Sequence, residues 1–495
     1  MAADAESSKS TPTRKPSVFT FLAAGSALLG AIAMGTVLGW SSPAVADMYT
    51  NDSHPRLTQT GSDVTVESWI KSSTTLGALV GALASGPLAQ VIGRKLSLIL
   101  YSIPMLAGFG CLWLAKDFAT IITGRTLTGL GAGLVSGTAP TYVVEIATEN
   151  VRGLLGTGFQ LSVTIGILLV YVFGAFLSWG WLSFWCLFPP LAMGVLMLLM
   201  PETPIWLMTK AGGDHSKGSR VEKSLKSLRA ADNDNESELN ELADQAREAQ
   251  RSKGFSMQES TNPLFYKPLV LSVVLMFLQQ FSGINAVMFN SAKMIQESGS
   301  SMKGTHASII IAVAQVIATL VGSLLVDRLG RKMLLIGSGA GHAVSLGILG
   351  FFYVANPDRG TWGWLPILCL VLFIISFSLG WGPVPWLMIN EITGVQYRGV
   401  VSAVATGVNW FCAFLITHNF DTIQAATSPQ FAFFLFAAFC IASIPFVIIF
   451  LPETKGKSFD DIARELAGSS AVTAAVDNTG AQNKLEMKGL NDDKP

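Results

Sequence analysis

The stretch Gly86–Lys95 reads GPLAQVIGRK, and a similar stretch, GSLLVDRLGRK, occupies Gly322–Lys332. A second pair of related stretches follows them, because Glu145–Gly153 reads EIATENVRG and Glu391–Gly399 reads EITGVQYRG. The members of the two pairs are 237 and 246 residues apart. Two motifs that recur in the same order at a nearly constant offset indicate a chain built from two related halves.

A third pair of motifs and the hydropathy extend this interpretation. PETP begins at Pro201 and PETKG at Pro452, which is an offset of 251 residues. Apolar residues make up 50% of the chain and charged residues only 13%, against roughly 25% charged residues in an average soluble domain. The charges crowd into 1–17, 202–267 and 452–495. This distribution excludes a disordered chain, a nucleic-acid-binding protein and an ordinary soluble enzyme.

Apolar stretches of about 20 residues, the length that spans a bilayer, predict twelve transmembrane helices. They cover 18–40, 69–92, 96–115, 119–144, 153–176, 179–201, 267–292, 305–327, 333–355, 363–390, 398–420 and 430–451. The predicted fold class is therefore an all-α polytopic membrane protein with two pseudo-symmetric six-helix halves. Duplicated halves of this kind are typical of transporters that bind their substrate at the membrane midplane between the halves.

The spans divide the chain into five regions. We expect a cytoplasmic N-terminal segment (1–17), an N-terminal half (18–201), a cytoplasmic loop with short amphipathic helices (202–266), a C-terminal half (267–451) and a mostly disordered cytoplasmic tail (452–495). With the termini inside, the cytoplasmic side holds 26 of the 33 Lys and Arg residues, as the positive-inside rule requires. Asn51-Asp52-Ser53 is then a glycosylation acceptor on the outer side. Segment 1–17 has no acidic dileucine signal, which favours the plasma membrane.

The polar chemistry of an enzyme is missing from the sequence. Five cysteines lie in apolar runs without a CxxC or Cys/His spacing, so they predict no zinc site and no disulfide framework. There is no nucleophile–base constellation and no Walker A motif. We expect no cofactor, no metal, no nucleic-acid partner and no obligate protein partner beyond the lipid bilayer.

Six uncharged amides fall inside predicted spans, and they are the sharpest evidence for a substrate. They are Gln160, Gln279, Gln280, Asn285, Gln315 and Asn409. An amide offers two donors and two acceptor sites, which suits the hydroxyls of a neutral polyol, although hydrogen bonding between helices is the alternative. A break at Ser282-Gly283 would bring Gln280 and Asn285 together.

A second group of polar residues maps to the cytoplasmic ends of spans, once in each half. It comprises Arg94, Glu145, Arg152, Arg331, Glu391, Arg398 and Glu453. We expect ion pairs that tie the halves together at the cytoplasm, hold the outward-open state and break when the inner gate opens. The alternative is positive-inside anchoring with solvated loops.

The sequence GWGPVPW places Pro383 and Pro385 within a span, ahead of Trp386. Proline interrupts the helical hydrogen bonds and allows a hinge. The indole of Trp386 offers an apolar face for a sugar ring and one N–H donor. An interfacial aromatic anchor is the alternative interpretation.

Taken together, GRK after spans 2 and 8, GRTLTGLGAGL, PETP, PETKG, QQFSGIN and GWGPVPW resemble the motifs of sugar porters of the major facilitator superfamily. The resemblance covers residues 18–466, and GWSSPA and PETP look most like the insect facilitated trehalose-transporter branch. It implies that Gln160, Gln279, Gln280, Asn285 and Asn409 match sugar-binding positions. Gln315 stands at a family Asn position, and the inner charges match gating positions.

The chain departs from that family at several positions. Gln90 replaces the usual Asp of the first-half motif, whereas the second half keeps Asp327. Asn290 replaces the second aromatic residue after GINAV. Ser378 falls near a position where many glucose-selective members carry an acid, and a smaller residue there suits a disaccharide.

Whether a proton drives transport can be predicted from span 1, because proton symporters of this family carry an Asp there. This chain has Gly39-Trp40-Ser41-Ser42 there, and no predicted span has an acid near its centre. His342 is the exception to consider, although such histidines are more often packed polar residues. We therefore predict facilitative uniport of trehalose or glucose. The alternatives are a proton-coupled symporter and a non-transporting sugar sensor.

Overall fold

The computed structural model describes residues 14–50, 54–58, 61–214, 219–230, 235–251, 260–297, 302–457 and 459–467. Within these residues it contains twelve helical spans long and apolar enough to cross a membrane, so the predicted fold class is confirmed. Four of the spans consist of two helices each. The glycosylation acceptor at Asn51 lies outside the described residues.

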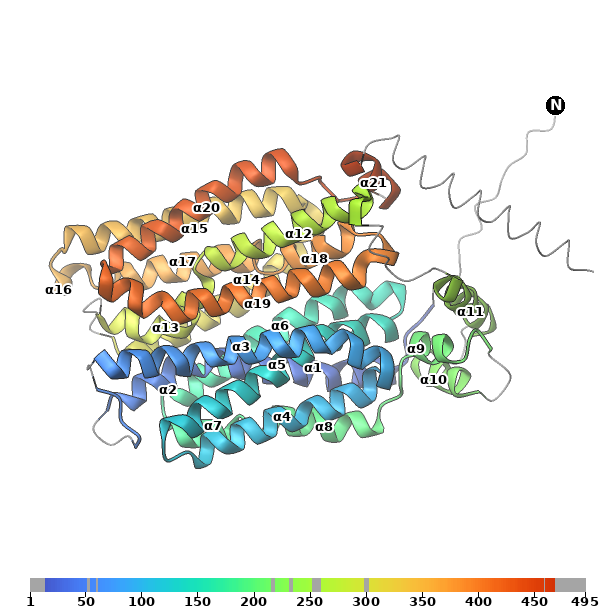
Figure 1. Cartoon of the computed structure of the whole chain (residues 1–495), viewed down its shortest axis with the longest axis horizontal. Coiled ribbons are helices and arrows are strands. Elements are labelled where there is room, and N and C mark those ends of the chain that lie inside the picture. The colour runs from blue at the N-terminus through green and yellow to red at the C-terminus, as the bar shows by residue number, and fades with distance from the viewer. Residues whose placement is uncertain are drawn as a thin grey trace, which may run out of the picture.

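The first six spans form one bundle and the last six form another, side by side (Figure 1). The N-terminal bundle comprises α1 (Val18–Gly39), α2 (Ser41–Met48), α3 (Gly61–Ile92), α4 (Arg94–Leu114), α5 (Phe118–Ile146), α6 (Glu149–Gly174), α7 (Trp179–Trp185) and α8 (Phe188–Leu199). The C-terminal bundle comprises α12 (Pro263–Phe281), α13 (Ile284–Glu297), α14 (Gly304–Leu329), α15 (Arg331–Ala355), α16 (Arg359–Trp362), α17 (Leu365–Leu379), α18 (Val384–Ile392), α19 (Val395–Ala426) and α20 (Pro429–Phe450).

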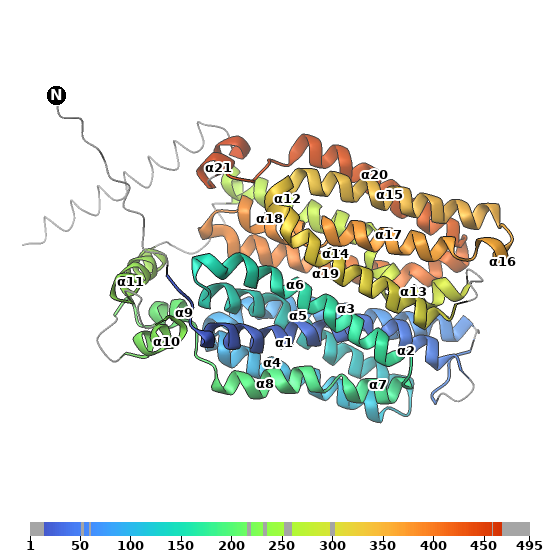
Figure 2. The ribbon, with the colours of Figure 1, turned by 180° about the vertical axis from the view of Figure 1, so that it is seen from behind.

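Four further helices lie beyond one end of the bundles. They are α9 (Pro204–Lys210), α10 (Arg220–Leu228), α11 (Asn235–Arg251) and α21 (Phe459–Ala467). We call this end the loop end. The opposite end, where α2, α7 and α16 lie in both views (Figures 1 and 2), is the far end.

The bundles meet along two long seams, at which α3 packs on α19 and α6 packs on α14. Within the N-terminal bundle, glycines allow α1 and α6 to approach closely. A Cβ atom on Gly35 would lie 2.1 Å from the carbonyl oxygen of Val163, and one on Gly166 would lie 2.2 Å from that of Ile32. Small residues of this kind are the usual means by which helices pack in lipid.

The loop helices form a small apolar cluster of their own at the loop end. Met208 of α9, Leu225 of α10 and Ala243 of α11 are buried together. Arg229 ties the group to the N-terminal bundle, because it donates to the Ile146 carbonyl at the end of α5 (2.8 Å) and pairs with Glu238 (2.7 Å). The described start of the chain joins them through an isolated bridge between Pro16 and Arg229.

Candidate functional site

The span that carries most of the predicted substrate residues is broken in its middle. Helix α12 ends at Phe281 and α13 begins at Ile284, so the break predicted at Ser282-Gly283 is present. Gly283 adopts a φ of 87°, a conformation that favours glycine. The break lets Asn285 donate to Gln280 Oε1 at 2.7 Å, which an unbroken helix would place on different faces.

Four of the predicted amides form one continuous hydrogen-bonded chain. Gln280 Nε2 donates to Asn409 Oδ1 (3.1 Å), and Asn409 Nδ2 donates to Gln279 Oε1 (2.6 Å). Gln279 Nε2 in turn donates to the Trp381 carbonyl (2.7 Å) and the Gly382 carbonyl (3.1 Å). The chain therefore runs from α13 through α12 and α19 to the non-helical segment between α17 and α18. We call Gln279, Gln280, Asn285 and Asn409 the amide chain.

The amide chain is neutral and held in place by its own members. Gln279, Gln280 and Asn409 are buried, whereas Asn285 is half-buried at the end of the chain. Each amide N–H₂ and C=O can make more than one hydrogen bond. A hydroxyl group can both donate and accept, so it can join or replace a link of the chain without leaving an amide unpaired.

Three predicted substrate residues are not joined to the amide chain by any hydrogen bond recorded in the described part of the structure. Gln160 is half-buried on α6, and Trp386 packs on the apolar cluster of Phe265 and Met276. Gln315 is buried on α14, and its Oε1 atom has no hydrogen-bond partner among the described residues. Ser378 Oγ on α17, which packs on α14, is also buried without a partner. Unpartnered polar atoms of this kind are costly unless a ligand or water satisfies them.

Arg125 is a buried cation that the sequence interpretation passed over. Its guanidinium donates to the carbonyl groups of Ile70 (3.2 Å) and Val37 (2.9 Å) and to Ser41 Oγ (2.7 Å). Its Cζ atom also lies 5.0 Å from the centre of the Trp40 ring, which stabilises a desolvated cation. The sequence does contain a sign of this buried cation, because Arg125 is a charged residue inside the predicted span 119–144.

The charged motifs at the loop end form the same arrangement in each half. Arg94 pairs with Glu145 (2.8 Å), and Arg331 pairs with Glu391 at the same distance. Thr203 Oγ1 donates to Glu145 (2.6 Å), as Thr454 Oγ1 donates to Glu391 (2.5 Å). The repeat seen in the sequence is thus repeated in side-chain contacts.

A second acid completes each arrangement by capping a helix N-terminus. Glu202 accepts from the backbone N–H groups of Arg94 and Lys95 at the start of α4, and Glu453 accepts from those of Arg331 and Lys332 at the start of α15. Carboxylates are stabilised at helix N-termini by the unpaired N–H groups. Glu202 was absent from the predicted set, although PETP matches PETKG.

The two capping acids differ in their surroundings. Burial raises the pKa of Glu202, against the effect of the backbone N–H groups of Thr203, Lys95 and Arg94. Burial also acts to raise the pKa of Glu453, but the backbone N–H groups of Lys455, Arg331, Lys332 and Thr454 outweigh it and hold that pKa below its usual value. The two halves are therefore alike in geometry and unlike in electrostatics.

In this conformation the charged side chains at the loop end pair with residues of their own half. Asp327 near the end of α14 pairs with Arg331 at the start of α15 (3.1 Å), and Arg398 donates to the Thr393 carbonyl (3.4 Å). Arg152 is exposed. Within the part of the chain that the structure describes, each ion pair of the predicted gating residues joins two residues of the same half. Pairing between the halves at the loop end stays a prediction, and it concerns the opposite conformation.

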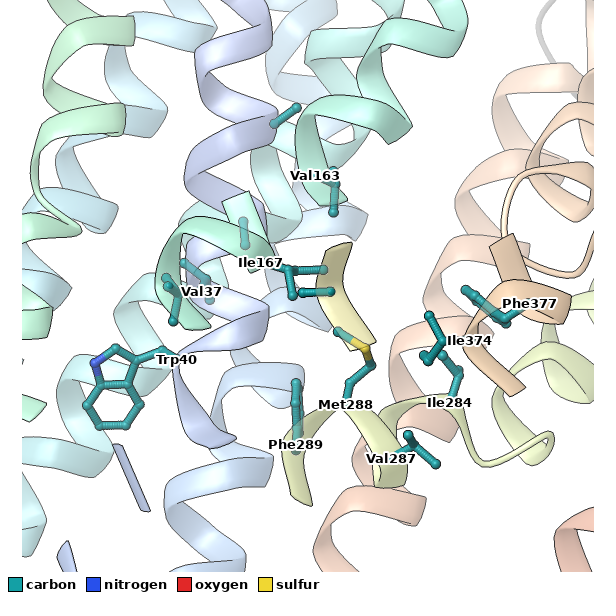
Figure 3. Packing of buried hydrophobic residues seen from close by; sticks show 14 of the residues in the cluster. Val37, Trp40, Val163, Ile167, Ile284, Val287, Met288, Phe289, Ile374 and Phe377 are labelled. Carbon is teal, nitrogen blue, oxygen red and sulfur yellow. The ribbon is translucent and has the colours of Figure 1, made fainter. Parts of the chain in front are cut away.

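At the far end the bundles are joined, and α13 is one of the elements that join them. Met288 of α13 lies between Ile167 of the N-terminal bundle and Ile374 of the C-terminal bundle (Figure 3), and Phe289 belongs to the same buried cluster. Tyr171 Oη of α6 donates to the Met288 carbonyl at 2.7 Å. Polar contacts extend this junction, since Ser42 and Ser291 lie 2.9 Å apart and Ser42 Oγ accepts from the Ala292 N–H.

Two remaining features lie apart from the amide chain. His342 is fully buried, and its ring centre lies 4.6 Å from that of Phe373. A hollow of about 410 Å³ at the far end is lined by Asp47, Trp113, Trp179 and other residues, none of which belongs to the amide chain. Among the described residues no group of three or more His, Cys, Asp and Glu side chains could hold a metal ion.

Comparison with known proteins identifies relatives along almost the whole chain. Residues 27–466 match the family model described as "Sugar (and other) transporter". The chain is 38% identical over 486 residues to a facilitated trehalose transporter Tret1-2 homolog of Drosophila simulans, covering 96% of this chain and 97% of that protein. It is 37% identical to the facilitated trehalose transporter Tret1 of Culex quinquefasciatus, covering 97% of this chain and 92% of the relative.

Solved structures share the fold at lower identity. The proton:xylose symporter XylE bound to 6-bromo-6-deoxy-D-glucose superposes with a TM-score of 0.74 at 23% identity, covering 90% of this chain and 99% of XylE. The inward-open conformation of XylE from E. coli gives the same TM-score at 22% identity, covering 90% and 100% of the two chains. These likenesses establish the twelve-helix arrangement.

Proposed function

The chain belongs to the sugar transporter family of the major facilitator superfamily, and from that premise we propose that it is a facilitative uniporter of a neutral sugar, trehalose or glucose. Alternating access between the two bundles carries the sugar past the amide chain. The relatives named as facilitated trehalose transporters favour trehalose. Sugar transport itself is the activity of the family.

The observation that carries the uniport proposal is the environment of Arg125. A carboxylate that exchanges protons would have to lie at membrane depth beside a partner that responds to its charge. The three oxygen atoms that accept from the Arg125 guanidinium belong to two backbone carbonyl groups and to Ser41. Neither a hydroxyl group nor a backbone carbonyl group titrates in the physiological range, so no proton uptake or release at these acceptors changes the contacts of this cation.

The substrate site in this proposal is built from neutral groups. The amide chain provides donors and acceptors on α12, α13 and α19, and the buried Gln315 Oε1 and Ser378 Oγ atoms lack partners. Gln160 on the N-terminal bundle and Trp386 complete the proposed set. A neutral site of this composition fits sugar hydroxyls better than an ion or an amino acid, because no charge is available to balance theirs.

We further propose that both termini and the loop end face the cytoplasm, that the protein resides in the plasma membrane, and that Asn51 carries a glycan. The charged arrangements around Arg94 and Arg331 then lie at the inner gate. Together with Arg152 and Arg398 they would pair across the halves when that gate closes.

The test of the substrate site is the uptake of radiolabelled trehalose and glucose by oocytes that express the wild type or the Gln280→Ala variant. The substitution removes the partner of both Asn285 and Asn409. A neutral hydrogen bond contributes about 1 kcal/mol, so the loss of one or two such bonds to the sugar should raise the KM for sugar roughly fivefold to thirtyfold.

The matched control is Asn419→Ala, which removes an exposed amide from the same helix as Asn409. We expect its uptake to equal that of the wild type once surface expression is normalised. Unchanged KM values for Gln280→Ala would remove the amide chain from the transport path.

A further inference from the structure

Four charged side chains meet at the far end, at the junction of the two bundles. Glu67 and Lys71 come from α3 of the N-terminal bundle, and Lys293 of α13 and Asp421 of α19 come from the C-terminal bundle. Glu67, Lys71 and Asp421 are buried, whereas about a third of the Lys293 side chain is exposed. We call these four residues the charge square. They include two acids and two bases, so the group is neutral.

Each lysine of the charge square contacts both acids. Lys71 Nζ lies against Glu67 and 2.8 Å from Asp421. Lys293 Nζ lies 3.2 Å from Glu67 and 3.0 Å from Asp421. Two ion pairs therefore stay within a bundle, Glu67–Lys71 and Lys293–Asp421, and the other two cross between the bundles.

Neutral polar groups surround the charge square and satisfy its remaining atoms. Tyr49 Oη donates to Glu67 Oε2 at 2.5 Å, and Asn290 Oδ1 accepts from Lys71. Next to Lys71 on the same helix, Ser72 Oγ lies 3.0 Å from His418 Nδ1 of α19. The square is thus part of a polar junction between α3, α13 and α19.

The charge square contains one acid and one base from each bundle, and this determines the charge that each bundle keeps when the far end opens. A buried charge that loses its only partner is strongly destabilising. Here each bundle keeps one acid and one base when the two crossing pairs break, so neither half is left with an unbalanced charge. The crossing pairs stabilise the closed far end. The pairs within each bundle keep both bundles free of an unbalanced charge when the far end opens.

From this geometry we infer that the charge square is the outer gate lock of the transport cycle. In the lock, Lys71–Asp421 and Lys293–Glu67 form when the far end closes and break when it opens. This inference rests on the proposed alternating-access function, because a lock acts only if the two bundles separate at this end.

The experiment reverses the charges of one half at a time. The double substitution Glu67→Lys with Lys71→Glu keeps the pair within the N-terminal bundle but makes both crossing contacts like-charged. Adding Lys293→Asp with Asp421→Lys restores all four opposite-charge contacts. The two variants therefore separate the crossing pairs from the charges themselves.

The readout is the distance between spin labels on cysteines at Lys116 and Asn356, exposed far-end residues of the two bundles. It is measured by pulsed electron paramagnetic resonance on the full chain in lipid nanodiscs, with Cys111 replaced by alanine. We expect the N-terminal double variant to shift the distribution to longer distances and the four-fold variant to return it to the wild-type distribution. Equal distributions for wild type and double variant, or no return in the four-fold variant, would overturn the lock.

A milder pair of variants covers the case in which charge reversal prevents folding. Lys293→Met removes one crossing pair, and it should shift the distances in the same direction by less. Lys303→Met, at an exposed lysine of the same end, should leave them unchanged. Labelled-sugar uptake by the wild type is measured in parallel. Unshifted distances with sugar uptake present reject the lock alone, whereas shifted distances without uptake reject the transport proposal.

Discussion

Arg125 is a single residue that contacts several helices of the N-terminal bundle. A guanidinium without contact to water is stable only if its donors are satisfied, and here two helix carbonyl groups, one hydroxyl group and the face of Trp40 surround it. These partners come from α1, α2 and α3, whereas Arg125 stands on α5. The residue therefore holds four helices of the N-terminal bundle together.

Replacing Arg125 by alanine tests this role. We expect Arg125→Ala to lower the free energy of unfolding by about 3 kcal/mol, because it leaves a cavity and removes the hydrogen bonds of a charged group. The thermal unfolding midpoint of the purified protein in detergent measures the loss. Arg56→Ala, at an exposed arginine of the far end, serves as the control, and an equal midpoint for the two variants would contradict the account.

Among single residues, the sequence singles out the four members of the amide chain, whose substrate role stays a prediction, and it does not single out the charge square. Gln279, Gln280, Asn285 and Asn409 stand out because an amide inside an apolar span needs a partner whatever the fold. Glu67 does not stand out, since it lies just before the apolar stretch that begins at 69. Its burial results from contact with α13 and α19, more than 200 residues away, which no local pattern reports.

At the scale of an element, the broken span of α12 and α13 holds members of both the amide chain and the charge square. Its first part presents Gln279 and Gln280, and its second part presents Asn285 to the amide chain and Lys293 to the charge square. The Gly283 φ of 87° makes both orientations possible. The same two residues that interrupt the helix thus connect the proposed substrate site to the proposed outer lock.

Gly283→Ala is the substitution that tests the break. Alanine at this φ costs about 1–2 kcal/mol, and its Cβ atom would lie 2.6 Å from Phe436 Cδ2. We expect sugar uptake to fall about tenfold at equal surface expression. Gly337→Ala provides the control, because nothing lies within 4 Å of a Cβ atom there. Uptake at the control level for both variants would show that the break is not needed.

At the scale of the whole molecule, the twelve spans and the two-fold repeat could be predicted because hydropathy and duplicated motifs are written along the chain. Which end of the molecule is closed could not be predicted from the sequence. The sequence predicts charges at the loop end that join the halves, and the structure shows them closed within each half while the far end is joined. Which end is closed depends on a balance between two packed states, and one sequence encodes both.

We propose that this member of the sugar transporter family moves sugar without a driving ion. The most direct measurement is the steady-state concentration of labelled trehalose inside proteoliposomes with an imposed inward proton gradient, and of labelled glucose in a parallel series. We expect the inside concentration to rise to the outside value and to stop there, with or without a protonophore. Accumulation above the outside concentration that a protonophore abolishes would contradict it.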